Sequence, residues 1–340
     1  MKTLYDSKIY IEELKKVASD PIFKELEGKT ILITGGTGLV LSYFVDAILN
    51  SNIKCIIFLV VRNFRDAMAR FSSHVGDPRL QFIEKELSDL ASLDRLQMDY
   101  VIAGASRTNP VDCQNRPVEV LMDNLIGAKN ALSVASNYVK SKFLLLSTTK
   151  VYGLNKDALN ENDFSLINSM STADILGFSK LAAEKLTLAY SKEHNVDVSI
   201  ARLSRTFGPT LKYTDTKEIS EFYFETLNGD DIYLHTEGTE TIPFHYVGDA
   251  VRAICYILVK GENGLAYNVG PEESFELLEI AETIGTHANK EVQFSENKKP
   301  SPKTSKTLLS IEQIKKLGFE NKFNLKESLK QTYDILKDIY

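Results

Sequence analysis

Glycines cluster at one point near the start of the chain, between two apolar segments. Residues 31–38 read ILITGGTG, so a strand-forming run leads directly into a glycine turn, and a helix is expected from about Val40 to Asn50. Gly35 permits the tight turn, Gly38 lets the backbone approach a ligand, and the N-terminus of the helix attracts anions. This arrangement predicts a site for a dinucleotide pyrophosphate, with a purely structural turn as the alternative. The residues expected to hold the ligand are Gly35, Thr37, Gly38 and Leu39.

The third glycine expected in such a turn is replaced by Leu41. A glycine at that position normally allows the helix to pack closely against the strand. We therefore expect Leu41 to push the helix outward or to change how the helix packs.

The second apolar segment ends in Arg62-Asn63, where a bound dinucleotide would place its adenosine ribose. An acidic residue at this point accepts the 2′-hydroxyl group of NAD, whereas an arginine pairs with the 2′-phosphate of NADP. We therefore expect Arg62 and Asn63 to contact the cofactor, and Arg62 favours NADP over NAD. A solvated surface arginine is the alternative.

No group of residues has the spacing of a metal site or of an activated nucleophile. The histidines are scattered along the chain, and neither a GxSxG elbow nor a Walker lysine occurs. Cys55, Cys113 and Cys255 are isolated, which predicts no disulfide framework and fits a reducing compartment. His245 precedes an expected helix and stands near a possible substrate position, but a packed or surface histidine is the favoured interpretation.

Short apolar runs alternate with amphipathic stretches through the first two thirds of the chain. Such alternation is typical of parallel strands buried on both faces, so the expected fold is a doubly wound α/β sheet. The expected helices include Asn124–Tyr138, Gly177–His194 and Asp249–Val259. The expected strands are Thr30–Thr34, Cys55–Val61, Gln81–Leu87, Tyr100–Gly104, Phe143–Ser147, Val198–Leu203 and Leu265–Val269.

The alternation stops after Gly208-Pro209, which indicates a second structural unit. Near its end, Ser295–Lys306 is polar and predicts a surface loop. The expected units are an N-terminal helical extension (1–28), a dinucleotide-binding domain (29–207, with 248–270 returning to it) and a smaller substrate-binding lobe (208–247 and 271–340).

Composition excludes several classes of partner. The chain has 340 residues, of which 43% are hydrophobic and 25% charged, and its formal net charge is −6. A nucleic acid or an acidic membrane surface requires a basic face, so neither is expected as a partner. The longest apolar run, Cys55–Val61, is far shorter than the roughly 20 residues that span a bilayer. The first residues, Met1-Lys2-Thr3, are not followed by the apolar segment of a signal peptide, so none is expected. The expected location is the cytoplasm.

Seven short segments follow one another along the chain in a recognisable order. They are TGGTG (34–38), DNLIGAKNAL (123–132), LLLSTTKVYG (144–153), GFSKLAAEKL (177–186), RLSRTFGP (202–209), HYVGDAVRAI (245–254) and AYNVG (266–270). The ordered set resembles the NAD-dependent epimerase/dehydratase family of the extended short-chain dehydrogenase/reductase superfamily. The resemblance implies a Rossmann domain, a nicotinamide cofactor and a C-terminal lobe for a nucleotide-diphosphate sugar.

The same resemblance implies an alcohol oxidation begun by the tyrosine of a YxxxK pair. The lysine lowers the tyrosine pKa and holds the nicotinamide ribose, while a Ser or Thr positions the sugar oxygen. Thr148 falls at the hydroxyl position and Lys180 at the lysine position, but the tyrosine position is Leu176. Leucine can neither take nor give a proton. Tyr152 is the nearest candidate substitute, although in the family it is more often structural.

Two further departures concern the carboxylates that some family members add after the hydroxyl residue. Dehydrating members carry an Asp-Glu pair there and decarboxylating members a Glu, whereas this chain has Thr149 and Lys150. The usual 4,6-dehydration and decarboxylation mechanisms are therefore disfavoured. Epimerases and ketoreductases do not need that pair.

The expected substrate side is altered as well. Arg205 stands where the family often has an asparagine that contacts the diphosphate, and Ile242 replaces a frequent phosphate-binding arginine. An arginine grips a diphosphate with two parallel hydrogen bonds, so Arg205 compensates for the loss at Ile242 in one interpretation. An ion pair within the protein is the alternative, equally weighted.

Two expected helices, Asn124–Tyr138 and Gly177–His194, resemble the pair through which extended family members form a dimeric four-helix bundle. A small apolar stripe of Ala182, Ala183, Leu186 and Ala189 suits that packing. A homodimer is therefore expected, with packing on the chain's own sheet as the alternative. Asn124 itself is expected to brace the active-site strands through backbone hydrogen bonds.

These observations leave two hypotheses from different classes. The first is an NAD(P)-dependent nucleotide-sugar epimerase or ketoreductase that retains Thr148 and Lys180 but lacks the usual tyrosine. The second is a catalytically silent protein that binds NAD(P) and a nucleotide sugar and regulates or scaffolds a pathway. The second is motivated by the departures at Leu41, Lys150, Leu176 and Ile242.

Overall fold

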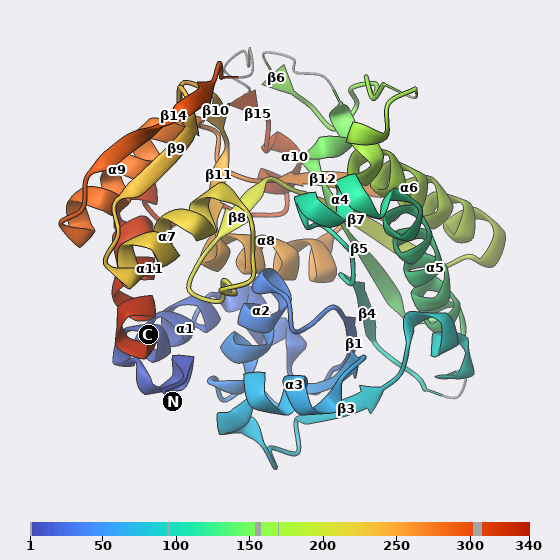
Figure 1. The fold of residues 1–340 in the computed structure, drawn as a ribbon. Helices are drawn as coiled ribbons and strands as arrows, with labels where there is room; N and C mark the ends of the chain where they lie inside the picture. The colour runs from blue at the N-terminus through green and yellow to red at the C-terminus, as the bar shows by residue number, and fades with distance from the viewer. Residues whose placement is uncertain (1, 94–95, 154–157, 169, 302–307) are drawn as a thin grey trace.

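The computed structural model describes residues 2–93, 96–153, 158–168, 170–301 and 308–340. Its centre is a seven-stranded sheet in which every neighbouring pair of strands is parallel (Figure 1). The strands, in spatial order, are β12 (Leu265–Val269), β7 (Asp197–Leu203), β5 (Lys142–Thr148), β4 (Tyr100–Ala103), β1 (Thr30–Thr34), β2 (Ile56–Val61) and β3 (Leu80–Glu84). The order runs outward in both directions from β1 and β4, so the predicted doubly wound sheet is confirmed.

Helices cover both faces of this sheet. On one face lie α2 (Leu39–Leu49) and α8 (Val247–Lys260), which contact one another, and on the other lie α5 (Pro117–Ser136) and α6 (Ile175–His194), at the right in Figure 1. Successive strand residues point to opposite faces. Accordingly, Ile31 and Ile33 join one core and Leu32 joins the other. Burial on both faces explains why these strands are continuously apolar in sequence.

Most strand boundaries lie within one residue of their predicted positions, and the largest difference is at the end of the third strand. The third strand was expected over Gln81–Leu87, but β3 ends at Glu84 and a 3₁₀ helix, η4, runs from Leu87 to Leu93. The side-chain amide of Asn130 donates hydrogen bonds to the carbonyl oxygens of Leu87 and Ser88, at 2.7 and 3.0 Å. These bonds from α5 hold the chain in a turn, so tertiary contacts determine where the strand ends.

The later part of the chain forms a smaller group of helices and short strand pairs, coloured yellow to red at the left of Figure 1. Its main elements are α7 (Glu218–Asn228), β9 (Ile232–Thr236), α9 (Leu277–Ala288), β14 (Val292–Lys299), α10 (Glu312–Lys315) and α11 (Leu325–Ile339). Its short pairs are β8 (Arg205–Phe207) with β11 (Phe244–Tyr246) and β10 (Thr241–Ile242) with β13 (Phe275–Glu276). Its strand β15 (Leu308–Leu309) pairs with β6 (Ala158–Leu159) from the earlier part of the chain.

The prediction of a surface loop over Ser295–Lys306 is wrong for the first residues of that range. Residues 295–299 belong to β14, which pairs in parallel with β9. Most β14 side chains are exposed, so polar residues occur in this strand without cost, and they resemble a loop in sequence. Residues 302–306 lie outside the described residues.

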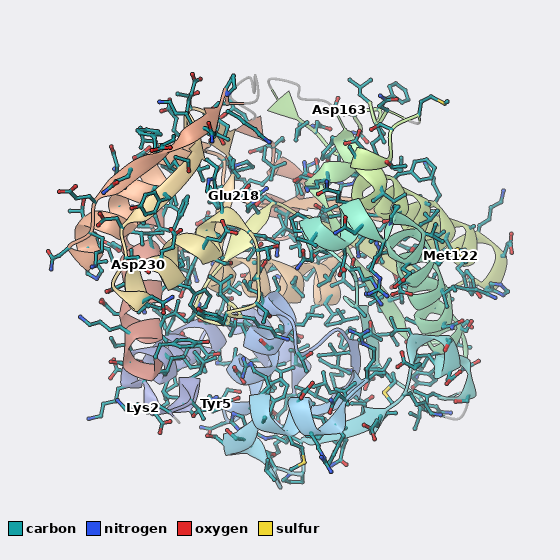
Figure 2. The ribbon with its side chains drawn as sticks, in the orientation of Figure 1. Lys2, Tyr5, Met122, Asp163, Glu218 and Asp230 are labelled. Carbon is teal, nitrogen blue, oxygen red and sulfur yellow. The ribbon has the colours of Figure 1, made fainter. Side chains whose placement is uncertain are left out.

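The N-terminal segment folds onto the sheet domain through α1 (Lys8–Ala18). The hydroxyl groups of Tyr5, labelled in Figure 2, and of Tyr10 donate to the two carboxylate oxygens of Asp46 in α2, at 2.7 and 2.5 Å. Arg252 of α8 forms a buried ion pair with Asp20 at 2.7 Å. The segment is therefore tied to both helices on this face. Among the described residues, no helix combines the length and apolar character needed to cross a membrane.

Candidate active site

The glycine turn joins the carboxyl end of β1 to α2. Gly35 has φ +74°, and a Cβ atom there would lie 2.5 Å from the backbone nitrogen of Ala105, so only glycine fits. Gly38 is the N-cap of α2 and supplies no side chain to the first-turn N–H groups. No side chain among the described residues caps these N–H groups, so they can bind an anion. Thr37 and Leu39 are half-buried beside them, and the Leu39 carbonyl accepts a hydrogen bond from the Thr210 hydroxyl at 2.7 Å.

Leu41 is buried and packs inward over Gly104, which follows β4. The expected change in packing is therefore visible: the leucine occupies the space that a side chain at residue 104 would need. Gly104, directly after the neighbouring strand, thus leaves the space for close packing that a glycine in the helix would otherwise provide.

The end of β2 carries the residues expected at the adenosine ribose. Arg62 is exposed and has no hydrogen bond or ion pair with any other described residue. Asn63 is the N-cap of α3 (Phe64–Arg70), and its side-chain oxygen Oδ1 accepts hydrogen bonds from the backbone nitrogens of Arg65 and Asp66. Asn63 therefore orients the turn after β2, while Arg62 is available to a ligand.

A second cation reaches the same edge from the later part of the chain. Lys212 lies in the loop after β8, and burial together with Arg70 and Arg62 lowers the pKa of its ammonium group. Sequence inspection did not identify this residue, because its proximity to Arg62 arises only from the folding of that loop onto α2 and α3.

The residues at the family's catalytic positions lie on β5 and α6. Thr148 ends β5, is half-buried, and accepts a hydrogen bond on Oγ1 from the Lys150 backbone nitrogen at 3.3 Å. Lys180 is buried, and its Nζ donates to the Leu146 carbonyl oxygen at 2.8 Å. Burial lowers the Lys180 pKa to about 8, although Glu184 opposes the shift. Leu176, one helical turn before Lys180, is 7% exposed.

A cavity of about 590 Å³ opens beside Leu176. It is formed by the turn after β5, by the first turn of α6 and by α4 (Pro110–Asn115). Residues on its wall include Cys113, Gln114, Lys150, Asp174, Leu176 and Gly177. Lys150 and Cys113 were not predicted as site residues, although the position of Lys150 in the carboxylate-bearing motif was a usable signal.

Tyr152 is not the substitute for the missing tyrosine. Its hydroxyl is buried, donates to Asn268 Oδ1 at 2.6 Å and accepts from Arg202 at 3.0 Å. Burial raises the Tyr152 pKa to about 12. Arg202 in turn pairs with Glu184 at 2.8 Å, so Tyr152 belongs to a buried network beneath the cavity.

Two substrate-side residues make contacts within the protein. Arg205 of β8 forms an ion pair with Glu218 at the start of α7, which Figure 2 labels. The structure thus shows the ion-pair alternative in the absence of a ligand. Ile242 lies on β10 opposite Phe275 of β13. An apolar side chain therefore fits its surroundings.

Other expected residues serve the framework. Asn124 accepts from the Ser106 hydroxyl and donates to the Ser179 hydroxyl, both at 2.8 Å. It braces the loop after β4 against α6, but through side chains and not through the backbone as predicted. His245 is buried and contacts Asn321 at 3.0 Å. No cluster suited to a metal ion occurs among the residues that the structure describes.

The glycine turn, the exposed Arg62 and the cavity thus lie at the carboxyl ends of β1, β2 and β5, along one edge of the sheet. This edge is where open α/β sheets bind ligands. A model of the NAD dependent epimerase/dehydratase family matches residues 31–270. The chain belongs to this family.

This family belongs to the extended short-chain dehydrogenase/reductase superfamily, and the curated relatives are consistent with it. UDP-glucuronic acid decarboxylase 6 of Arabidopsis thaliana is 29% identical over 306 residues, covering 88% of this chain and 86% of the relative. UDP-glucuronic acid decarboxylase 1 of Danio rerio is 28% identical over 312 residues, covering 91% and 72%.

Among solved structures, UDP-glucuronic acid 4-epimerase from Bacillus cereus, in complex with UDP-glucuronic acid and NAD, has a TM-score of 0.79. It is 22% identical, and the match covers 92% of this chain and 100% of that one. UDP-N-acetylglucosamine 4-epimerase from Methanobrevibacter ruminantium M1 has a TM-score of 0.80 at 20% identity, covering 91% and 98%. At these identities the likeness establishes the Rossmann-type fold.

Proposed function

We propose that the protein binds NAD(P) and a nucleotide-diphosphate sugar and acts as an epimerase or ketoreductase. The observation that carries the proposal is the uncapped N-terminus of α2 beside Gly35, on the same sheet edge as the Leu176 cavity. At Gly35 the backbone of Gly104 and Ala105 leaves no room for a Cβ atom, as the tight turn of a dinucleotide site requires. When bound, the nicotinamide supplies the capacity to accept and return a hydride.

We propose NADP as the preferred cofactor, with NAD as the alternative. Arg62 is exposed without a protein partner among the described residues, and its positive charge is one of the causes that lower the pKa of Lys212. Two cations from separate segments suit the 2′-phosphate of NADP. The solved relative from Bacillus cereus is an NAD complex, so NAD remains the competitor in any binding experiment.

Epimerisation or keto reduction is proposed because Thr149 and Lys150 supply no carboxylate for elimination. The similarity to UDP-glucuronic acid decarboxylases gives no support to excluding decarboxylation, so this part of the proposal rests on those two residues alone. Thr148 is proposed to position the sugar oxygen and Lys180 to hold the nicotinamide ribose. Arg205 is proposed to exchange Glu218 for the substrate diphosphate.

The substrate is proposed to be a UDP-sugar or a related nucleotide sugar, since the named relatives act on or bind UDP-sugars. The proposed organisation keeps an extension (1–28), a cofactor domain (29–207 with 248–270) and a substrate lobe (208–247 with 271–340). We further propose a cytoplasmic homodimer. The dimer is supported by apolar side chains exposed on α5 and α6, namely Val118, Met122 and Phe178.

A silent binding protein is the second candidate. It is favoured by one observation: Leu176 lines the cavity where the family's proton acceptor stands, and Tyr152 does not replace it. Such a protein would bind both ligands without turnover and would regulate or scaffold a nucleotide-sugar pathway.

The test is to follow the near-ultraviolet absorbance of reduced nicotinamide during incubation with NAD or NADP and a panel of UDP-, dTDP-, GDP- and CDP-sugars. An epimerase that returns its hydride still shows transient reduction with its own substrate. A signal with one sugar supports the enzyme and names the substrate. Silence across the panel, with both ligands bound in calorimetry, supports the silent protein.

A further inference from the structure

Lys150 and Leu176 share one wall of the cavity because the turn after β5 and the start of α6 are in direct contact. A Cβ atom on Gly177 would lie 2.6 Å from the Lys150 carbonyl oxygen, so glycine permits this approach. The same carbonyl accepts a hydrogen bond from the Gly153 nitrogen at 3.1 Å, and Thr148 fixes the Lys150 nitrogen. The backbone of Lys150 is therefore held on both sides, and Lys150 is one of the residues that line the cavity.

Three of the charged groups near the Lys150 amine are paired with other residues. Glu218 pairs with Arg205, and Lys217 pairs with Asp215 at 2.9 Å. Among the described residues, the Lys150 ammonium has no ion-pair partner. The charged and titratable groups that face it or share its cavity are Arg205 on β8, Lys217 and Glu218 at the start of α7, Cys113 on α4 and Asp174 before α6.

This environment weakens the hold of the Lys150 amine on its proton. Lys150 is exposed as a whole residue, yet burial of its amine against protein and the positive charge of Arg205 lower its pKa. Cys113 and Glu218 oppose the shift. Burial raises the pKa of the Cys113 thiol, so that neighbour stays protonated. A lysine amine with a lowered pKa loses its proton more readily, and lysines of this kind act as proton acceptors in many active sites.

Lys180, the other lysine of the candidate active site, is not open to a ligand in the same way. Lys180 is buried, and its Nζ donates a hydrogen bond to the Leu146 carbonyl oxygen. Tyr152 is bonded to Asn268 and Arg202. Lys150 is thus the basic side chain that the described structure leaves open to a ligand at the Leu176 cavity.

We propose that the Lys150 amine takes the role of proton acceptor and donor that Leu176 cannot fill. This inference rests on the proposed function, an NAD(P)-dependent conversion of a nucleotide sugar. In the oxidation, the sugar O–H bond breaks and its proton moves to Nζ of Lys150. The C–H bond electrons leave as hydride to the oxidised nicotinamide, and a carbonyl forms. In the reverse direction, Nζ returns the proton as the carbonyl is reduced.

The decisive comparison is Lys150→Met with Lys150→Arg. Methionine removes charge and proton acceptor, while arginine keeps the charge but is never deprotonated in proteins. Both variants are expected to lower kcat by about 10²–10⁴-fold, the usual contribution of a positioned general base. Only Lys150→Met is expected to raise KM as well. Lys330→Met, an exposed site on α11, is the matched control and leaves both values unchanged.

The wild-type kcat for sugar oxidation is expected to rise with pH as Lys150 loses its proton, and Lys150→Arg is expected to abolish that rise. If Lys150 only attracts an anionic ligand, arginine restores kcat, and the proposal is overturned. Circular dichroism and cofactor affinity verify that each variant is folded.

A second measurement needs neither turnover nor a variant. The ligand-free wild-type protein is acetylated competitively with acetic anhydride over a range of pH values, and peptides are quantified by mass spectrometry. Lys150 is expected to reach half-maximal reactivity at a lower pH than Lys330, and a bound nucleotide sugar is expected to protect it. Equal titration of the two lysines overturns the proposal.

The outcomes also separate this inference from the function on which it rests. Wild-type protein that binds both ligands without reducing the cofactor overturns proton transfer by Lys150, while the binding part of the proposed function stands. Failure to bind a nicotinamide cofactor overturns the proposed function itself.

Discussion

Leu41 of α2 lies directly over Gly104, so that a Cβ atom on residue 104 would fall 2.2 Å from Leu41 Cδ1. The Thr34 carbonyl oxygen and Leu146 Cδ1 lie 3.1 and 3.2 Å from the same point. Gly104, directly after the neighbouring strand, therefore leaves the space for close packing that a glycine in the helix would otherwise provide. The two positions are coupled, and a change at one depends on the residue at the other.

The Gly104→Ala variant is expected to lower the free energy of unfolding by about 1–3 kcal/mol, because the added methyl group overpacks the core. Leu41→Ala alone is expected to cost about 2–5 kcal/mol through loss of buried contacts. The double variant should lose less than the sum, since the two alanines fit together. Urea denaturation of all four proteins measures this coupling, and strictly additive losses would contradict the contact.

A second relationship links α1 to α2 and to β11. Tyr43 of α2 and Tyr246 of β11 each donate a hydrogen bond of 2.5 Å to Glu13 Oε1, while Glu13 Oε2 has no partner among the described residues. Burial raises the Glu13 pKa above its ordinary value of 4.5. The folded state therefore holds this proton more tightly than the unfolded state, and the resulting stabilisation is lost as the pH rises through the raised pKa.

The Glu13→Gln variant mimics the protonated carboxyl group at every pH. Its melting temperature is expected to fall less than that of the wild type as the pH is raised from 4.5 through the neutral range. Glu12→Gln, an exposed neighbour on the same helix, is the control and should follow the wild type. Parallel curves for wild type and Glu13→Gln would show that Glu13 is already ionised in the folded state.

The order of the central strands and helices was predictable because burial on both faces leaves a strong signal in sequence. For the strands Thr30–Thr34 and Leu265–Val269, the predicted first and last residues are the observed ones, since each run is mainly apolar and bounded by turn residues. β14 escaped prediction because its side chains are exposed, so its composition is that of a loop. The end of β3 was misplaced because Asn130, far along the chain, fixes the following turn.

The candidate site was predictable only where function fixes backbone geometry. The turn at Gly35 has a positive φ that reserves it for glycine, and that requirement is visible in sequence. The approach of Lys212 to Arg62 and the pairing of Arg205 with Glu218 depend on how the later segments fold back. The side-chain partners of Asn124 were unpredictable for the same reason.

Cofactor preference gives a direct test of Arg62. Arg62→Gln is expected to weaken NADP binding about 10–100-fold, the effect of losing charge-assisted hydrogen bonds, while NAD binding changes little. Arg65→Gln, an exposed arginine in the next helix, is the matched control. Isothermal titration calorimetry with both nucleotides measures the ratio. An equal loss of affinity for both would mean that Arg62 does not recognise the 2′-phosphate.

The α5–α6 surface gives a test of the proposed dimer. Met122, labelled at the right of Figure 2, and Phe178 are 46% and 44% exposed on these adjacent helices. The wild type is expected to have twice the chain mass of 38.2 kDa in light scattering, and Met122→Glu with Phe178→Glu is expected to give the single-chain mass. Buried charges without partners disfavour association. Val75→Glu, at an exposed valine elsewhere, should leave the mass unchanged.

The last prediction concerns the lost tyrosine. Leu176 stands four residues before Lys180 on the same helix face and lines the cavity, so a tyrosine there would place its hydroxyl near the reacting position. In the Lys150→Met background, Leu176→Tyr is expected to raise the rate of cofactor reduction about 10²–10⁴-fold, because it supplies a new proton acceptor. Leu176→Phe provides the same ring without the hydroxyl and should give no recovery. If a folded, cofactor-bound Leu176→Tyr protein stays inactive, or if phenylalanine restores activity equally, then the loss of chemistry at this site does not arise from the missing hydroxyl group.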